Sequence, residues 1–256
     1  MSAALPSAPA GWLAGEVLGR GSITTTFTVA QGDKRAVCKR LLPRTADNEI
    51  ARASLSREGK ILQHLDGRGA PRWIADGEDA GGLWLLLELE AMASLGARMR
   101  EAAGPLAPSF VARATEATFG ALERVHAAGV VHGDLSPDNL LVAADGEAAR
   151  LIDFGLASAA DWPPLADGAF RGTLVYAAPE VARGEPFGAA ADRFALAACL
   201  AHAALGAPPR EGPDAAMLAR AGEVPLDAYA ARARALVAGA AGDRIAHHLA
   251  FDARVR

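Results

Sequence analysis

Two separated segments of the chain carry side chains that could act together on a phosphate group. The first is the polar stretch 132–139 (HGDLSPDN), and the second is the Asp-Phe-Gly tripeptide that begins at Asp153. A carboxylate fixed in a short loop, as we expect for Asp134, can orient an acceptor hydroxyl and take its proton. Magnesium binds through one or two carboxylates together with phosphate oxygens and water. The set therefore indicates phosphoryl transfer, with Asp134 as the base and Asn139 and Asp153 as metal ligands.

Each segment is weak evidence by itself. Asp-Phe-Gly is compatible with an ordinary turn after a strand, because Gly155 lets the backbone turn without a Cβ clash. The nearby His126 and His132 could suggest a zinc site, but no Cys, Asp or Glu set completes one at the usual spacing. We therefore expect both histidines to be packed side chains, with His132 anchoring the loop of Asp134.

These segments, together with others in the same order along the chain, resemble the eukaryotic-type serine/threonine protein kinases. The variant is bacterial-looking, with His-Gly-Asp in place of His-Arg-Asp. The segment 18–22 (LGRGS) is similar to the family's glycine-rich loop, and the segment 36–39 (AVCK) is similar to the part of the third strand whose lysine, here Lys39, contacts the phosphates. Glu58 stands where the family has the partner of that lysine. The resemblance implies that ATP and Mg²⁺ are used and that Asp134, Lys39 and Glu58 are catalytic.

The resemblance also implies a set of nucleotide-binding residues. The segment 85–95 is similar to the fifth strand and the hinge between two lobes, where Leu87 would lie behind the adenine and the backbone from Glu88 to Glu90 would bind it. An ordinary buried strand explains this segment equally well. The implied nucleotide-binding residues are Leu18, Gly19, Gly21, Val29, Ala36, Lys39, Leu87, Glu88, Glu90 and Leu141.

A third group of motifs follows further along the chain. The segment 172–180 (GTLVYAAPE) resembles the family's peptide-substrate loop with its Ala-Pro-Glu ending. Asp192 is similar to the buried aspartate that holds the backbone of the catalytic loop. Arg256 is similar to an arginine that would pair with Glu180. Together they imply a protein acceptor rather than a small molecule.

Three positions depart from the family pattern. Thr24 replaces the third glycine of the loop, Gly133 replaces the arginine before the base, and Ser136 replaces a lysine that contacts the transferring phosphate. The loss of that arginine implies an enzyme that does not depend on activation-loop phosphorylation. The loss of the lysine implies lower activity or another compensating cation. Whether Ser158 or Thr173 is itself phosphorylated stays open.

Periodicity and the resemblance together predict an α+β, two-lobed protein-kinase-like fold with the nucleotide between the lobes. We expect a flexible lead-in at 1–10, a small β-rich lobe with one main helix at 11–90, and a larger, mainly helical lobe at 91–256 that lacks the family's last helix. The expected strands are 12–19, 24–30, 36–41, 72–75, 83–89, 140–142 and 149–152, and the expected helices include 47–65, 108–128 and a core helix within 194–209.

Composition excludes several classes of protein. The chain has 256 residues, of which 51% are hydrophobic and 22% charged, which is typical of globular proteins. Its net charge is −4 and no basic block stands out, so we expect no nucleic-acid partner. The longest apolar run, 194–209, falls short of the ~18 consecutive apolar residues of a membrane span. Cys38 and Cys199 lie in apolar runs, so reduced buried thiols and a cytoplasmic location are expected.

Two other functions remain possible at this point. His-Gly-Asp also resembles the loop of antibiotic kinases, which favours a small-molecule phosphotransferase of the aminoglycoside-kinase type. Thr24 and Ser136 favour a pseudokinase that binds ATP and acts as a scaffold. The interpretation as an active protein kinase is preferred because Asp-Phe-Gly, the 172–180 segment and all of the implied catalytic residues occur together.

Overall fold

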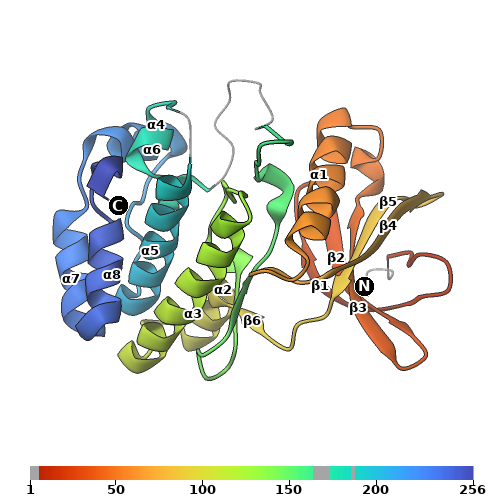
Figure 1. Cartoon of the computed structure of the whole chain (residues 1–256), viewed down its shortest axis with the longest axis horizontal. Coiled ribbons are helices and arrows are strands. Elements are labelled where there is room, and N and C mark those ends of the chain that lie inside the picture. Colours follow the sequence, from red (N-terminus) through yellow and green to blue (C-terminus); the bar gives the residue numbers. More distant parts are fainter. Residues whose placement is uncertain (1–5, 164–172, 186–187, 256) are drawn as a thin grey trace. The chain divides into compact units, whose positions relative to one another are not determined.

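The computed structural model describes residues 6–163, 173–185 and 188–255. The chain divides into two compact units, Met1–Ala91 and Met92–Arg256. This division falls one residue after the lobe boundary that the sequence predicts. The first unit is β-rich and the second is mainly helical, as an α+β fold of two lobes requires (Figure 1).

The first unit is a five-stranded antiparallel sheet with one helix beside it (Figure 1). The strands lie in the order β1-β2-β3-β5-β4. Strands that follow each other directly in the chain are neighbours in the sheet, whereas β3 and β4, which are separated by α1, are not. The β-branched and aromatic residues of Thr24–Gln31 suit a pleated surface. The elements are β1 (Leu13–Arg20), β2 (Thr24–Gln31), β3 (Lys34–Leu41), α1 (Glu49–Leu65), β4 (Trp73–Asp79) and β5 (Gly82–Glu88).

The two faces of this sheet carry different residues. One face holds a buried apolar cluster formed by Phe27, Val29, Ala36, Cys38 and Leu86. Trp12, Trp84 and Ala8 pack against this cluster. Ala8 belongs to the predicted lead-in at 1–10, so residues of the described part of that segment contact the sheet.

Helix α1 covers the opposite face. Its first turn is capped by Asn48, whose side chain accepts a hydrogen bond from the Ala51 N–H at 2.9 Å. A Cβ built on Gly59 would lie 3.5 Å from Leu85, so the helix and β5 pack closely. The buried side of the helix includes Ala51, Leu55, Glu58, Ile61, Leu62 and Leu65.

The second unit is built around α5, which is buried along most of its length. Its run of alanines lets neighbouring elements approach, and α3, α7 and α8 pack beside it (Figure 1). A helix that is apolar on all sides belongs in a core, as predicted for this segment. The helices are α2 (Leu95–Ala102), α3 (Pro108–Ala127), α4 (Pro179–Ala182), α5 (Ala189–Leu205), α6 (Asp214–Glu223), α7 (Asp227–Val237) and α8 (Gly239–His248).

A small three-stranded sheet lies in the same unit. It has the order β6 (Ala93–Ser94), β7 (Leu140–Val142) and β8 (Ala149–Leu151). The sequence predicted the last two strands but not β6. Two residues carry no readable alternation, so β6 is recognisable only through its pairing with Leu141 and Val142.

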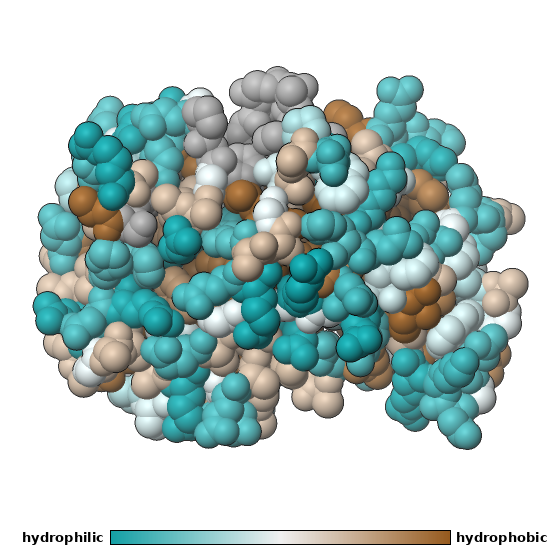
Figure 2. All heavy atoms as spheres, viewed as in Figure 1, coloured by the Kyte–Doolittle hydropathy of each residue, from teal (hydrophilic) through white to brown (hydrophobic). Residues whose placement is uncertain are grey.

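The surface mixes polar and apolar side chains. On the face shown in Figure 2, hydrophilic and hydrophobic groups are interspersed. Within the ranges that the structure describes, no helix has the length and hydropathy needed to cross a membrane.

Candidate active site

Lys39 and Glu58 form the buried ion pair that the resemblance implies. Lys39 Nζ lies 2.7 Å from Glu58 Oε2, and the two residues are 9% and 2% exposed. Lys39 comes from β3, and Glu58 comes from the buried side of α1. The pair therefore links the helix to the centre of the sheet and holds the ammonium group in a fixed position.

Replacing Lys39 by methionine is expected to lower the free energy of unfolding by ~3–5 kcal/mol, because the buried Glu58 carboxylate then loses its partner. Adding Glu58→Gln should recover part of the loss, since no uncompensated charge remains. Chemical denaturation measures both values. The exposed Lys60 on the same helix provides the control, because Lys60→Met should change stability by no more than ~0.5 kcal/mol. Equal effects at Lys39 and Lys60 would contradict the expectation.

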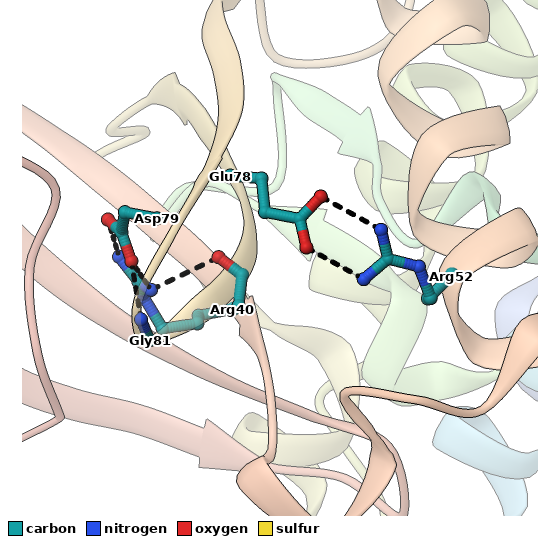
Figure 3. A network of polar contacts seen from close by, with 6 residues as sticks. Arg40, Arg52, Glu78, Asp79 and Gly81 are labelled. Atoms are coloured by element: carbon teal, nitrogen blue, oxygen red, sulfur yellow. Dashed lines mark hydrogen bonds and ion pairs between the residues drawn. The ribbon is translucent and has the colours of Figure 1, made fainter.

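Two further ion pairs brace the elements that carry Lys39 and Glu58 (Figure 3). Arg40, which is buried, donates to both carboxylate oxygens of Asp79 at 2.6 and 2.8 Å and to the carbonyl of Gly82 at 3.2 Å. Arg52 of α1 donates to both carboxylate oxygens of Glu78 at 2.8 and 2.9 Å. The first pair ties β3 to β4, and the second ties α1 to β4. Their geometry holds the strand and the helix at the spacing that the Lys39–Glu58 pair requires.

The predicted phosphate loop is an open turn between β1 and β2. The Gly21 N–H donates to the Thr24 carbonyl at 2.9 Å and closes the turn. A Cβ built on Gly19 would meet no atom within 4 Å, so packing inside the protein does not require glycine there. Glycine at this position therefore leaves space beside the backbone, which a phosphate group could use. Leu18 beside it is exposed.

The strand register corrects two of the implied nucleotide contacts. Val29 pairs with Ala36, and both lie in the buried apolar cluster. Side chains alternate between the faces of a strand, so Lys39 lies on the opposite face from Ala36. The structure thus does not bring Val29 and Ala36 together with Lys39.

The residues that do share the face of Lys39 can be read from the same register. Thr26 pairs directly with Lys39, and Val37 lies two positions before it in β3. Val37 in turn pairs with Leu87 of β5. Sequence reasoning missed Val37, and it left Thr26, which stands where the family has a valine after the glycine-rich loop, out of the nucleotide-binding set. Counting back in steps of two from Lys39 would have found Val37.

The end of β5 gives a partial account of the expected hinge contacts. Leu87 is buried on the face of Lys39, as its implied role requires. The N–H of Glu88 already donates to the carbonyl of Arg72 at 2.9 Å, so it is not available to a base. Backbone hydrogen bonds to adenine would therefore use the carbonyl of Glu88 and the backbone of Glu90.

In the second unit, Asp192 holds the backbone of the 132–139 loop. This carboxylate is 2% exposed and accepts hydrogen bonds from the N–H groups of His132 at 2.8 Å and Gly133 at 2.9 Å. His126 Nε2 lies 2.8 Å from the same side chain. The role implied for Asp192 is therefore observed, and His126 is a partner of Asp192 rather than a simple packed histidine. Gly133 has φ +77°, a conformation in which glycine is favoured.

His132 anchors the loop from within the core. Its ring is fully buried, and Nε2 lies 3.0 Å from the carbonyl of Ile152. Its ring centre lies 4.7 Å from that of Phe154. The histidine thus connects the loop of Asp134 to the Asp-Phe-Gly segment, as predicted.

Asp134 is held in one orientation. Its Oδ1 accepts hydrogen bonds from the backbone N–H and from the hydroxyl of Thr173, each at 3.0 Å. Asn139 Nδ2 donates to the Asp134 carbonyl at 2.8 Å. Burial raises the pKa of Asp134, while the charge of His132 and the hydrogen bonds from Thr173 oppose the rise. Thr173, which the sequence assigns only to the peptide-substrate segment and to possible phosphorylation, is a direct partner of the expected base.

The backbone connects the segments of the two expected metal ligands. The Ile152 N–H donates to the Asn139 carbonyl at 3.0 Å, which aligns Asp153 with Asn139. The amide nitrogen of Asn139 is used by Asp134, so its oxygen remains available to a cation. Among the described residues, no group of three or more His, Cys, Asp or Glu side chains could hold a metal. A set of two oxygens fits magnesium, which takes its other ligands from phosphate and water.

The other residues named in the sequence predictions lie partly inside and partly outside the described part of the chain. Ser136 is buried, and Leu141 is half-buried between Ser94 and Arg150 in the small sheet. Ser158 is also buried, and its backbone pairs with Val131. Gly172 and Arg256 lie outside the described residues, and so does the proposed pair between Arg256 and Glu180.

Both cysteines are unreactive thiols. Cys38 and Cys199 are buried and form no disulfide. Burial raises the pKa of Cys38 to about 12 and raises that of Cys199 well above its ordinary value. Neither is a candidate nucleophile, because a nucleophilic cysteine must be a thiolate.

Comparisons with known proteins agree with this geometry. The family described as "Protein kinase domain" matches residues 12–224. Serine/threonine-protein kinase PknD of Mycobacterium tuberculosis is 34% identical over 196 residues, which cover 75% of this chain and 29% of that protein. The probable serine/threonine-protein kinase PkwA of Thermomonospora curvata is 32% identical, with 75% of this chain and 26% of that protein covered.

A plant protein kinase is similar to this chain to a comparable degree. Mitogen-activated protein kinase kinase kinase 17 of Arabidopsis thaliana is 30% identical over 207 residues, which cover 77% of this chain and 53% of that protein. The aligned part of this chain spans less than a third of the two bacterial relatives and about half of the plant one. With its family match over most of its length and its motifs in place in both units, this chain belongs to the protein kinase family.

Proposed function

We propose that the chain is a serine/threonine protein kinase that transfers the γ-phosphate of ATP to hydroxyl groups of a polypeptide. The observation that carries this proposal is the arrangement around Asp134. Its carboxylate is fixed by Thr173, and two oxygen ligands suited to magnesium, from Asn139 and Asp153, are connected to its loop. A fixed base next to such ligands is what phosphoryl transfer requires of a protein.

Each residue has a distinct task in this function. Lys39, fixed by Glu58, would bind the phosphates as a point charge. Asp134 would orient the acceptor hydroxyl and take its proton, through the carboxylate oxygen that Thr173 does not occupy. Asn139 and Asp153 would hold magnesium, which when bound neutralises charge on the phosphates. The departures at Thr24 and Ser136 leave all of these groups in place.

The acceptor is proposed to be a polypeptide. Thr173 touches the base, and the residues that follow it form a short 3₁₀ turn, Leu174–Tyr176, which continues into α4. This ordered segment offers an extended acceptor a surface beside Asp134. An aminoglycoside or sugar acceptor remains the second candidate, because His-Gly-Asp occurs in such enzymes.

Independence from activation-loop phosphorylation is also proposed. Gly133 stands where the family has an arginine that binds the phosphorylated loop, so this chain lacks that guanidinium. The neighbouring elements are ordered by Asp192 and His132 instead.

The free, buried thiols support a reducing, cytoplasmic location as part of the same proposal.

The function can be tested through magnesium. We expect Mg·ATP to stabilise the protein, by about 2.7 kcal/mol when the ligand is present at ~100 times its dissociation constant. Asp153→Ala should remove the magnesium dependence of this stabilisation, which a thermal melting experiment measures. Glu147→Ala, at an exposed turn in the same unit, is the control and should leave it intact. A response to magnesium that survives in Asp153→Ala would remove this residue from the metal site.

A transfer assay separates the possible acceptors. Labelled ATP is supplied with a generic protein, with aminoglycosides and with sugars. Label in the protein supports the protein kinase, and label only in a small molecule supports the second candidate. Tight binding of ATP without transfer to any acceptor would instead indicate a pseudokinase scaffold.

A further inference from the structure

Arg210, in the loop after α5, is a buried cation whose polar partners are backbone carbonyls. The residue is 6% exposed, and one of its terminal nitrogens donates to the carbonyls of Ala177 at 2.9 Å and Val175 at 3.4 Å. Its guanidinium carbon lies 5.6 Å from the centre of the Phe194 ring. Within the described ranges, the other terminal nitrogen has no hydrogen-bond partner and no carboxylate pairs with the group.

This burial is unfavourable for a charged group. Desolvation lowers the pKa of Arg210 to about 10, so the guanidinium stays charged at neutral pH. An apolar side chain of similar volume stabilises such a position as well as or better than a buried charge does. Stability alone therefore does not explain an arginine here. What distinguishes it from a methionine or leucine is that it can hold two carbonyl groups at once.

Both of those carbonyls belong to the segment that touches the expected base. At the start of this segment, Thr173 donates two hydrogen bonds to Asp134. In its middle, the hydroxyl of Tyr176 lies 2.8 Å from His202 Nδ1 of α5. At its end, Arg210 holds Val175 and Ala177. The position of Thr173 against the base therefore depends on contacts at the other end of the turn.

We propose that Arg210 is a positioning residue that fixes the segment Thr173–Ala177 beside Asp134 so that a polypeptide acceptor can bind there. The proposal rests on the function proposed above, in which Asp134 is the base. Neighbouring residues of an extended acceptor are ~3.3 Å apart, so an acceptor that brings its hydroxyl to Asp134 must pass along the residues after Thr173. A water molecule that accepts the phosphate needs Asp134 but makes no contact along the residues after Thr173. Arg210 should therefore affect transfer to a polypeptide far more than hydrolysis of ATP.

The test compares Arg210→Met with the unmodified protein in two reactions. Arg210→Met should raise the KM for a protein acceptor ~10-fold or more, because a tenfold change in a binding constant corresponds to the loss of one contact of moderate strength. The KM for ATP should change less than about twofold, and ATP hydrolysis without acceptor should fall less than transfer does, because a water acceptor makes no contact along Thr173–Ala177. Arg210→Lys keeps the charge but not the fork of donors, so its KM should lie between the two. Arg232→Met, at an exposed arginine on α7, is the matched control.

Three results would overturn the proposal. One is an unchanged acceptor KM in a folded Arg210→Met protein. Another is an equal loss of transfer and hydrolysis in both Arg210 variants, which would mean a general structural role. The third comes from hydrogen exchange, which needs no activity. The amides of Thr173, Tyr176 and Ala177 are hydrogen-bonded and should exchange faster in Arg210→Met. Unchanged exchange contradicts the positioning role, whereas absent phosphate transfer in the unmodified protein contradicts only the proposed function.

Discussion

Replacing Asp134 by alanine is expected to lower kcat for phosphate transfer by at least ~10²–10⁴-fold, which is the contribution of a positioned proton acceptor. The reason is geometric: Thr173 fixes one oxygen of this carboxylate. Nucleotide binding should persist, because the residues assigned to the phosphates and the metal are unchanged. Steady-state kinetics and the thermal shift with Mg·ATP measure the two properties on one sample.

Two further variants sharpen this expectation. Asp134→Asn keeps the size and the contact with Thr173 but cannot accept a proton, so it should be as slow as the alanine variant. Asp138→Asn changes an exposed carboxylate in the same loop, paired with Arg100 at 2.9 Å, and should retain most of the rate. If Asp134→Asn kept the rate of the unmodified protein, Asp134 would not be the base.

Replacing Asp192 by alanine is expected to lower both stability and activity. The change leaves the N–H groups of His132 and Gly133 buried without an acceptor, and each such group costs about 1–3 kcal/mol. It also removes the partner of His126. Because those N–H groups belong to the loop of Asp134, the base should lose its fixed position as well. Urea denaturation reports the loss of stability, and the transfer assay reports the loss of rate.

Two further variants test whether the loss of stability comes from the contacts of Asp192. Asp192→Asn keeps one acceptor oxygen, so its stability should lie between that of the unmodified protein and that of the alanine variant. Asp243→Ala, at an exposed aspartate of α8 paired with Arg234, should change the unfolding free energy by less than ~1 kcal/mol. A variant of Asp192 that is as stable as the Asp243 control would show that the three contacts contribute little.

Two sets of contacts could be predicted from the sequence because the family resemblance names both partners. Lys39 and Glu58, and Asp192 with the 132–139 loop, were expected from their motifs and are observed. Most strands and helices were also expected within a few residues, since alternation and helical spacing extend over several residues. The two-residue strand β6 has no such length.

Predictions that depend on the face of a strand were less successful. An error of one position moves a side chain to the other face of the sheet. Ala36 lies three residues before Lys39 and so faces away from it, whereas Val37 faces the same way. Arg40 is a different case. No motif assigns it a partner, yet it is buried against Asp79, which is far away in the sequence. Local pattern cannot indicate which distant carboxylate a cation will find.

Helix α5 contacts the two parts of the second unit that the proposed reaction uses. Asp192 near its start holds the loop of the base, and His202 near its end meets Tyr176 of the acceptor segment. Residues ten positions apart on a helix are separated by ~15 Å along its axis, so the helix sets the distance between the loop of the base and the acceptor segment. A tilt of this one element would displace proton acceptance and substrate docking at the same moment.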